Sequence, residues 1–188
     1  MSLDLDTLAD QLLEELRPGL SADVLAQIAP LSMALAKAGR IVCHGVGREG
    51  LMMKALAMRL YHLGLDAHVV GDMTAPPVAA GDVLIVSAGP GQFSTVAALA
   101  KVAQNSGAQV ICITAEPDGA VPQAADLAVH LPAQTMAADQ GDAATSILPM
   151  GSLYEALMYL FFEVLVLDLR DRLAITPAAM RANHTNLE

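Results

Sequence analysis

Short apolar runs alternate with amphipathic segments through the middle of the chain. The runs are rich in Val and Ile and are bounded by glycine or polar residues, which is typical of buried strands. They are "IVCH" (41–44), "AHVV" (67–70), "VLIVS" (83–87), "QVICIT" (109–114) and a weaker run, "LAVHL" (127–131). Segments with helical spacing lie between them at 51–63, 94–106 and 121–125. This alternation predicts a parallel sheet with helices on both faces.

The N-terminal part of the chain has helical spacing. Leucines between positions 3 and 16 predict one helix, which ends at Pro18-Gly19. Ser21 is a suitable N-cap for a second helix that continues to Gly39. Pro30 falls inside this second helix and predicts a kink or a break there.

The C-terminal part predicts one long helix at 152–173. Its stretch "ALMYLFFEVLVLDL" is apolar nearly all round, so we expect it to be buried on several sides, with a subunit interface among them. Thr176-Pro177 predicts the start of a short last helix. No linker or repeat divides the chain. We therefore expect one domain over 1–188, with N-terminal helices at 1–38 and a C-terminal helix and tail at 149–188.

Composition narrows the classes of partner. The net charge of −10 argues against non-specific binding to nucleic acid and against docking on anionic membranes. Hydrophobic residues make up 54% of the chain, yet no uninterrupted run is long enough to span a membrane, so the surplus apolar surface predicts contact with another subunit in a homo-oligomer. The chain opens on no signal-peptide pattern, which predicts a cytoplasmic protein. Cys43 and Cys112 lie in apolar runs and are expected to be buried, reduced thiols.

Two glycine-rich loops follow predicted strands. "GVGREG" (45–50) follows the first strand and "SAGPGQFST" (87–95) begins at the end of the third. Backbone N–H groups at the start of a helix bind anions, so both loops are candidate phosphate cradles, with Arg48 as a fixed cation or as a surface partner of Glu49. The first loop also fits the dinucleotide fingerprint G-x-G-x-x-G, with Asp72 as the ribose ligand. Glu49, the second glycine loop and the lack of a substrate domain count against that alternative.

Longer segments resemble a known family. "GVGREGLMMKALAMRLYHLGLDAHVVGD", "GDVLIVSAGPGQFSTV", "SILPMGSLYEALMYLFFEVLVLDL" and the ending "NHTNLE" resemble the 6-phospho-3-hexuloisomerases, a branch of the sugar isomerase (SIS) domain family. The resemblance covers nearly the whole chain past residue 35. It implies a three-layer α/β/α sandwich with a five-stranded parallel sheet of the Rossmann-like, flavodoxin type, and a homotetramer. It also implies that 3-hexulose 6-phosphate and fructose 6-phosphate are interconverted through an enediol, without metal or cofactor.

The phosphate loops depart from the pattern of that family. Where relatives carry G-[AT]-G-R-S-G, Glu49 replaces the serine. Where they carry a second loop like G-S-G-S-G-E-T-K-S, the hydroxyls at 88, 90 and 93 are missing and Pro90 also lacks an N–H. Losing three partners of a charged group weakens binding about a thousandfold or more. The expected substrate-binding residues are Gly47, Arg48, Glu49, Ser87, Gly89, Gly91, Gln92, Ser94, Thr95 and His44.

Two residues are candidates for catalysis. The resemblance points to Glu155 as the base that moves a proton between neighbouring carbons, although Ser152-Leu153-Tyr154-Glu155 also fits a helix capping box. His184 matches the histidine of the family's tail, where it would open the sugar ring or shuttle protons, here or in the pocket of a neighbouring subunit. Its alternative is a mobile terminal side chain.

Three functional interpretations follow from these residues. The first is a phosphosugar isomerase whose phosphate is held differently from that of its relatives. The second is a SIS protein that binds a phosphosugar or another small metabolite, with or without turnover. A nicotinamide-dependent dehydrogenase is the third.

Overall fold

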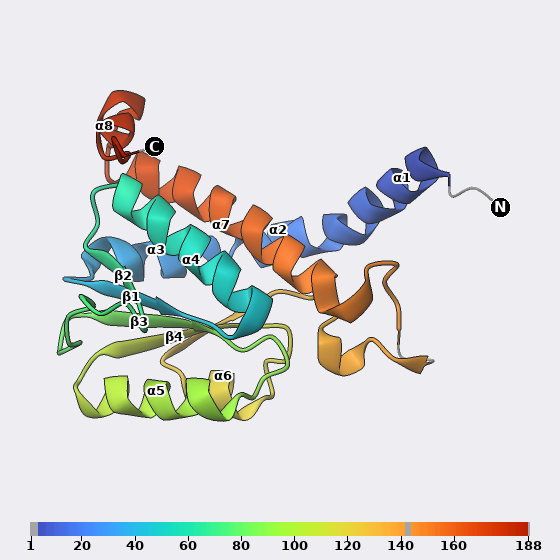
Figure 1. Cartoon of the computed structure of the whole chain (residues 1–188), viewed down its shortest axis with the longest axis horizontal. Coiled ribbons are helices and arrows are strands. Elements are labelled where there is room, and N and C mark those ends of the chain that lie inside the picture. Colours follow the sequence, from blue (N-terminus) through green and yellow to red (C-terminus); the bar gives the residue numbers. More distant parts are fainter. Residues whose placement is uncertain (1–3, 142–143, 188) are drawn as a thin grey trace.

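The computed structural model describes residues 4–141 and 144–187 and contains one parallel sheet (Figure 1). Its strands are β1 (Ile41–His44), β2 (Ala67–Val69), β3 (Val83–Ser87), β4 (Gln109–Thr114) and β5 (Leu127–His130). The order β2-β1-β3-β4-β5 is that of a flavodoxin-type sheet, so the predicted fold class is confirmed. Every neighbouring pair is parallel; Cys43, for example, pairs with Val69 on one side and Ile85 on the other.

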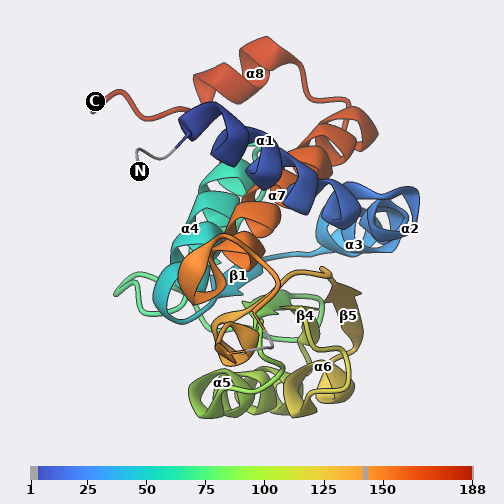
Figure 2. The same cartoon turned by 90° about the vertical axis from the view of Figure 1, so that its right-hand side faces the viewer.

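Helices cover both faces of the sheet (Figure 2). One face carries α3 (Ile28–Lys37), α4 (Gly47–His62) and α7 (Ser152–Arg172), and the other carries α5 (Ser94–Asn105) and α6 (Ala120–Ala124). Side chains alternate along each strand, so Ile41 and Cys43 join the first apolar cluster and Val42 joins the second. Both cysteines are buried free thiols, as predicted, and burial raises the pKa of each to about 12.

The long helix α7 is a core helix. By length and composition, the segment Pro149–Arg172 meets the requirements for crossing a membrane. In the fold, Leu157, Phe161 and Leu165 are among its buried residues, and the helix packs against α3 and α4. Contacts on several sides thus bury about 50% of its apolar window, whereas Tyr159 and Leu167 stay exposed.

Two helix boundaries differ from the sequence prediction. Helix α4 begins at Gly47 rather than at residue 51, so Arg48 and Glu49 lie in its first turn and not in a loop. The predicted second helix is divided into α2 (Ala22–Leu25) and α3, and the break lies at 26–27 rather than at Pro30. Pro30 lies in the first turn of α3, where a missing N–H costs nothing.

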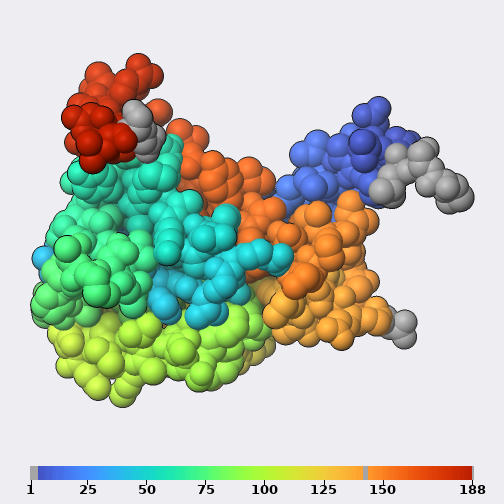
Figure 3. All heavy atoms as spheres, in the orientation of Figure 1, coloured from blue at the N-terminus to red at the C-terminus, as the bar shows by residue number. Residues whose placement is uncertain are grey.

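The two ends of the chain lie at the edges of the molecule. Helix α1 (Leu5–Leu16) projects from the body, with Leu5 and Leu13 exposed (Figure 3). It is joined to α2 by the 3₁₀ turn η1 (Arg17–Leu20). Helix α8 (Pro177–Ala182) begins at Thr176, whose hydroxyl accepts a hydrogen bond from the N–H of Ala179, so the predicted N-cap is confirmed.

Candidate functional site

The two glycine loops meet at the point where the strand order reverses. β1 and β3 are neighbours in the sheet, and the chain leaves their carboxyl ends into α4 and α5. Ligands of open α/β sheets bind in the crevice at such a switch point. The residues Gly45 and Gly50 close the first loop: a Cβ on Gly50 would lie 2.5 Å from the carbonyl oxygen of Gly45. These glycines therefore serve the tight strand-to-helix turn.

A pocket of about 490 Å³ opens beside the first loop. Its walls come from both loops, from the start of α7 and from the segment around the 3₁₀ turn η2 (Met136–Ala138). The lining residues are Val46, Gly47, Arg48, Glu49, Pro90, Phe93, Thr135, Met136, Ala137, Met150, Gly151, Tyr154 and Glu155. The pocket is thus mainly apolar, with one arginine and two glutamates.

Arg48 and Glu155 form an ion pair at this pocket. The Arg48 guanidinium donates to Glu155 Oε2 at 3.1 Å and also to the carbonyl oxygen of Met150. The Glu155 side chain is only 16% exposed, and burial raises the pKa of this carboxyl, although Arg48 acts in the opposite direction. Glu155 therefore combines a position on the pocket wall with a pKa moved towards neutrality.

The alternative capping role of Glu155 is not realised. The N-cap of α7 is Gly151, at φ 71°, and no side chain caps this helix. Ser152 is instead the first residue of the helix. The Glu155 carboxylate bonds to Arg48, and the residue lines the pocket.

Glu49 is a buried residue of the site. It is 7% exposed, and its Oε2 accepts hydrogen bonds from the Ser87 hydroxyl at 2.5 Å and from the Gly89 N–H at 3.0 Å. Burial raises the pKa of Glu49, while the two hydrogen bonds lower it. Gly89 is required here because a Cβ would lie 2.8 Å from Glu49 Oε1 and 2.8 Å from the Tyr154 ring. The carboxylate thus uses two donors that the sequence assigns to a ligand.

Comparison with known proteins agrees with this geometry. Residues 34–160 match the SIS domain family. The chain belongs to the SIS domain family. The 3-hexulose-6-phosphate isomerase of Bacillus subtilis is 36% identical over 149 residues, which cover 79% of this chain and 80% of that protein. The enzyme of the same name from Mycobacterium gastri is 36% identical over 164 residues, covering 86% of this chain and 80% of its own.

A solved structure extends this likeness to the fold. A Methanococcus jannaschii protein, whose inferred function is that of a 3-hexulose-6-phosphate isomerase, superposes with a TM-score of 0.81 at 29% identity. The match covers 98% of this SIS protein and 99% of that chain. The resemblance stated from the sequence motifs is therefore confirmed at the level of family and fold.

The structure brings only part of the predicted site together. Gly47, Arg48, Glu49 and Glu155 line the pocket of the SIS domain, and Ser87 and Gly89 contact Glu49 from behind. The remaining predicted residues of the second loop do not line the pocket; they are Gly91, Gln92, Ser94 and Thr95. Gln92, Ser94 and Thr95 are exposed at the start of α5.

Gly91 has a structural role in this fold. It adopts φ 79°, and a Cβ there would lie 2.8 Å from the Cα of Gly119. Its carbonyl oxygen also accepts a hydrogen bond from the N–H of Val121. The glycine thus allows the second loop to pack closely against the loop before α6.

The two predicted histidines lie outside the pocket. His44, at the end of β1, is half-buried, its Nε2 has no hydrogen-bond partner, and burial lowers its pKa. His184 stacks on His62, with ring centroids 5.2 Å apart, beside the hydrogen bond from Asn183 to the carbonyl of His62. His62 is the last residue of α4, whereas Glu49 is in its first turn, so His184 lies at the opposite end of that helix.

Sequence reasoning missed Tyr154 and the segment around Thr135. The Tyr154 hydroxyl is 3.3 Å from Ser87 Oγ, and the residue is 1% exposed. Thr135 and Met136 form one wall of the pocket, from a stretch without periodicity. The residue that could have indicated the wall around Thr135 is Gly151. A Cβ on Gly151 would lie 2.3 Å from the Met136 backbone nitrogen, so a glycine is needed where this segment meets the start of α7.

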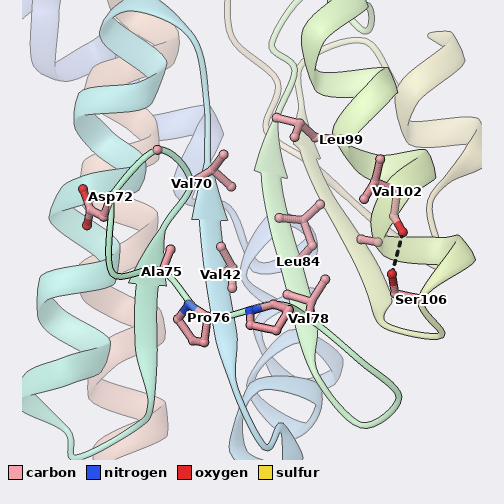
Figure 4. Close-up of a pocket in the computed structure, with 13 residues that line it drawn as sticks. Val42, Val70, Asp72, Ala75, Pro76, Val78, Leu84, Leu99, Val102 and Ser106 are labelled. Carbon is pink, nitrogen blue, oxygen red and sulfur yellow. Dashed lines mark hydrogen bonds between the residues drawn. The ribbon is translucent and has the colours of Figure 1, made fainter.

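A second hollow of about 370 Å³ lies on the other face of the sheet (Figure 4). Val42, Leu84 and Leu99 point into it, and Asp72 stands on the loop that borders it. It exists because no helix follows β2; residues 70–78 cross this face as a loop. None of the candidate catalytic residues lines it, and the part of the chain that the structure describes holds no group of three or more metal-ligating side chains.

Proposed function

We propose that this protein is a phosphosugar isomerase that interconverts 3-hexulose 6-phosphate and fructose 6-phosphate. Relatives of that name are 36% identical over most of this chain. The observation that carries the proposal from this chain's own structure is the Glu155 carboxylate, which lies on the pocket wall beside Arg48 with a raised pKa. A general base works best when its pKa lies near the working pH.

The reaction moves a carbonyl between neighbouring carbons of the 3-hexulose. One carbon is oxidised and the other is reduced, so no external oxidant or reductant is needed. Glu155 removes the proton from C2, and the electron pair forms the C2–C3 double bond while the C3 carbonyl oxygen becomes an enediolate oxygen. A proton moves from the C2 hydroxyl to that oxygen, and Glu155 returns its own proton to C3. Arg48 stabilises the negative charge that develops on oxygen.

A second function is supported by Glu49. Its carboxylate already uses the Ser87 hydroxyl and the Gly89 N–H, so the phosphate cradle is partly occupied by the protein. This favours, as the alternative, a SIS protein that binds a phosphosugar or another small metabolite without turnover.

Solvent exchange distinguishes the two functions. The protein is incubated with fructose 6-phosphate in D₂O, and carbon-bound deuterium is followed by NMR. An isomerase incorporates deuterium at C3 and accumulates the 3-hexulose, because the abstracted proton equilibrates with solvent. Saturable thermal stabilisation by the sugar phosphate without any exchange would refute the isomerase and support the binding protein.

Three further properties belong to this proposal. We propose that residues 1–188 form one SIS domain, that it works in the cytoplasm, and that it assembles as a homotetramer or a dimer. The exposed leucines of the projecting helix α1 support an assembly. We assign His184 a catalytic role only in such an assembly, where the tail of one protomer reaches the pocket of another.

A further inference from the structure

Glu49 is held like a bound anion. Its side chain starts in the first turn of α4 and reaches across the switch point to the end of β3. One hydroxyl and one backbone N–H donate to the same oxygen, and the residue is almost fully buried. Charge-assisted hydrogen bonds to a carboxylate and to a phosphate use the same donors.

Few replacement donors remain at this point of the site. Pro90 lacks an N–H, and the Gly91 N–H is bonded to the carbonyl of Ala88. The Arg48 guanidinium is already shared between Glu155 and the carbonyl of Met150. An oxyanion that binds at the end of β3 therefore has to take the Ser87 and Gly89 donors away from Glu49.

We propose that Glu49 is the specificity-determining residue of this pocket, an internal anion that occupies the phosphate subsite and with which a ligand's phosphate has to compete. This proposal adds to the proposed function. It depends on that function only in assuming that the substrate's phosphate binds at the Ser87 and Gly89 donors. A dianion beside an ionised Glu49 is repelled, so the chain selects against weakly held phosphate esters and free anions. Ligands enter when their remaining groups compensate for the displacement of Glu49.

Titration with sulfate tests this competition. Sulfate remains a dianion between pH 5 and 8, so any change with pH belongs to the protein. Binding is measured by calorimetry at pH 7.5 for the wild type, Glu49→Gln, Glu49→Ser and Glu14→Gln. Glu14 is a matched control because its side chain is 73% exposed and its loss removes the same unit of charge.

The expected order of affinity identifies the mechanism. Glu49→Gln keeps an oxygen that accepts from Ser87 and Gly89 but loses the charge, and Glu49→Ser also opens the space. We expect Glu49→Ser to bind sulfate about 10- to 100-fold more tightly than the wild type, with Glu49→Gln between them and Glu14→Gln unchanged. Equal affinities for all four proteins would overturn the proposal.

The pH dependence gives a second readout from the folded wild type. Because burial raises the pKa of Glu49, lowering the pH from 8 to 5.5 neutralises part of it and strengthens sulfate binding. Burial raises the pKa values of neighbouring Tyr154 and Cys112 above this range, so they stay neutral. Glu155 titrates in both proteins, beside the charged Arg48, so the difference from Glu49→Gln isolates Glu49. Parallel curves for the two proteins would contradict the proposal.

If a Glu49 variant does not fold, a crystal structure of the wild type grown in sulfate tests the same competition without any substitution. We expect sulfate on Ser87 and Gly89 only in molecules whose Glu49 side chain has turned away. Sulfate at other donors of the pocket, with Glu49 unmoved, would refute the competition. None of these sulfate measurements involves turnover. If Glu49→Ser binds sulfate more tightly while the wild type shows no deuterium exchange, the isomerase function is refuted and this inference still holds.

Discussion

Two arginine–glutamate pairs join α4 to α7, and they differ in what surrounds them. Arg59 and Glu163 form two parallel hydrogen bonds, at 2.9 and 3.0 Å, and both side chains are about one third exposed. Arg48 and Glu155 share a single bond at 3.1 Å, and Arg48 also bonds to a backbone carbonyl. In the first pair both carboxylate oxygens accept a hydrogen bond from the arginine. In the second pair only one oxygen of Glu155 does, so the carboxylate can still accept hydrogen bonds or a proton at the pocket. The same residue types thus form a structural salt bridge, the clamp, between Arg59 and Glu163, and a candidate catalytic pair between Arg48 and Glu155.

The largest expected difference is in turnover. Glu155→Gln removes the proposed base and should lower kcat by about 100- to 10,000-fold. Glu163→Gln removes the same charge from the same helix and should leave kcat within about threefold, because Glu163 lies outside the pocket. Initial rates of isomerisation, measured beside circular dichroism spectra of both variants, make the comparison. Similar losses in the two variants would show that the assignment of the base is wrong.

The arginines should separate in the same way, with a smaller effect. Arg48→Ala removes the guanidinium that orients Glu155 and stabilises the enediolate, so kcat/KM should fall about 10- to 100-fold. Arg59→Ala should leave kcat/KM nearly unchanged and reduce stability. Steady-state kinetics on both variants test this. An Arg59→Ala enzyme with the greater kinetic loss would mean that the clamp, and not the pocket pair, positions the active site.

Sequence reasoning predicted the sheet but not the inner contacts of the site. The strands were readable because continuous apolar runs such as "VLIVS" can be buried only in a doubly covered sheet. The start of α4 was missed because Val46, its N-cap, makes no side-chain cap that a pattern would reveal. The bond between Glu49 and Ser87 joins residues 38 positions apart and depends on which strands are neighbours. Tyr154 stands between Leu153 and Glu155, where the sequence pattern gives no separate signal for its hydroxyl.

The variant that we expect to lose activity should keep its stability, and the variant that we expect to keep its activity should lose some stability. Glu163→Gln breaks a two-bond pair that is partly exposed, so we expect a loss of about 1 kcal/mol or less in the free energy of unfolding. Glu155 is held with a raised pKa, which means that its charged form is disfavoured by folding. Glu155→Gln should therefore leave the free energy of unfolding unchanged or raise it. Urea unfolding at pH 7.5 provides the measurement, and a larger loss in Glu155→Gln than in Glu163→Gln would contradict the distinction.

The smallest effect is the slope of stability with pH. When the folded-state pKa of a carboxyl lies above its unfolded value, the folded protein binds more protons between the two values, so stability falls as the pH rises through that window. Glu49 and Glu155 both contribute in this sense, and the lowered pKa of His44 acts in the opposite sense in every variant. Melting temperatures from pH 4.5 to 8 should therefore fall less steeply in Glu49→Gln and Glu155→Gln than in the wild type. Glu163→Gln, which keeps both buried carboxyls, should retain the wild-type slope; a shallower slope in this variant as well would show that the effect comes from general charge and not from the pocket.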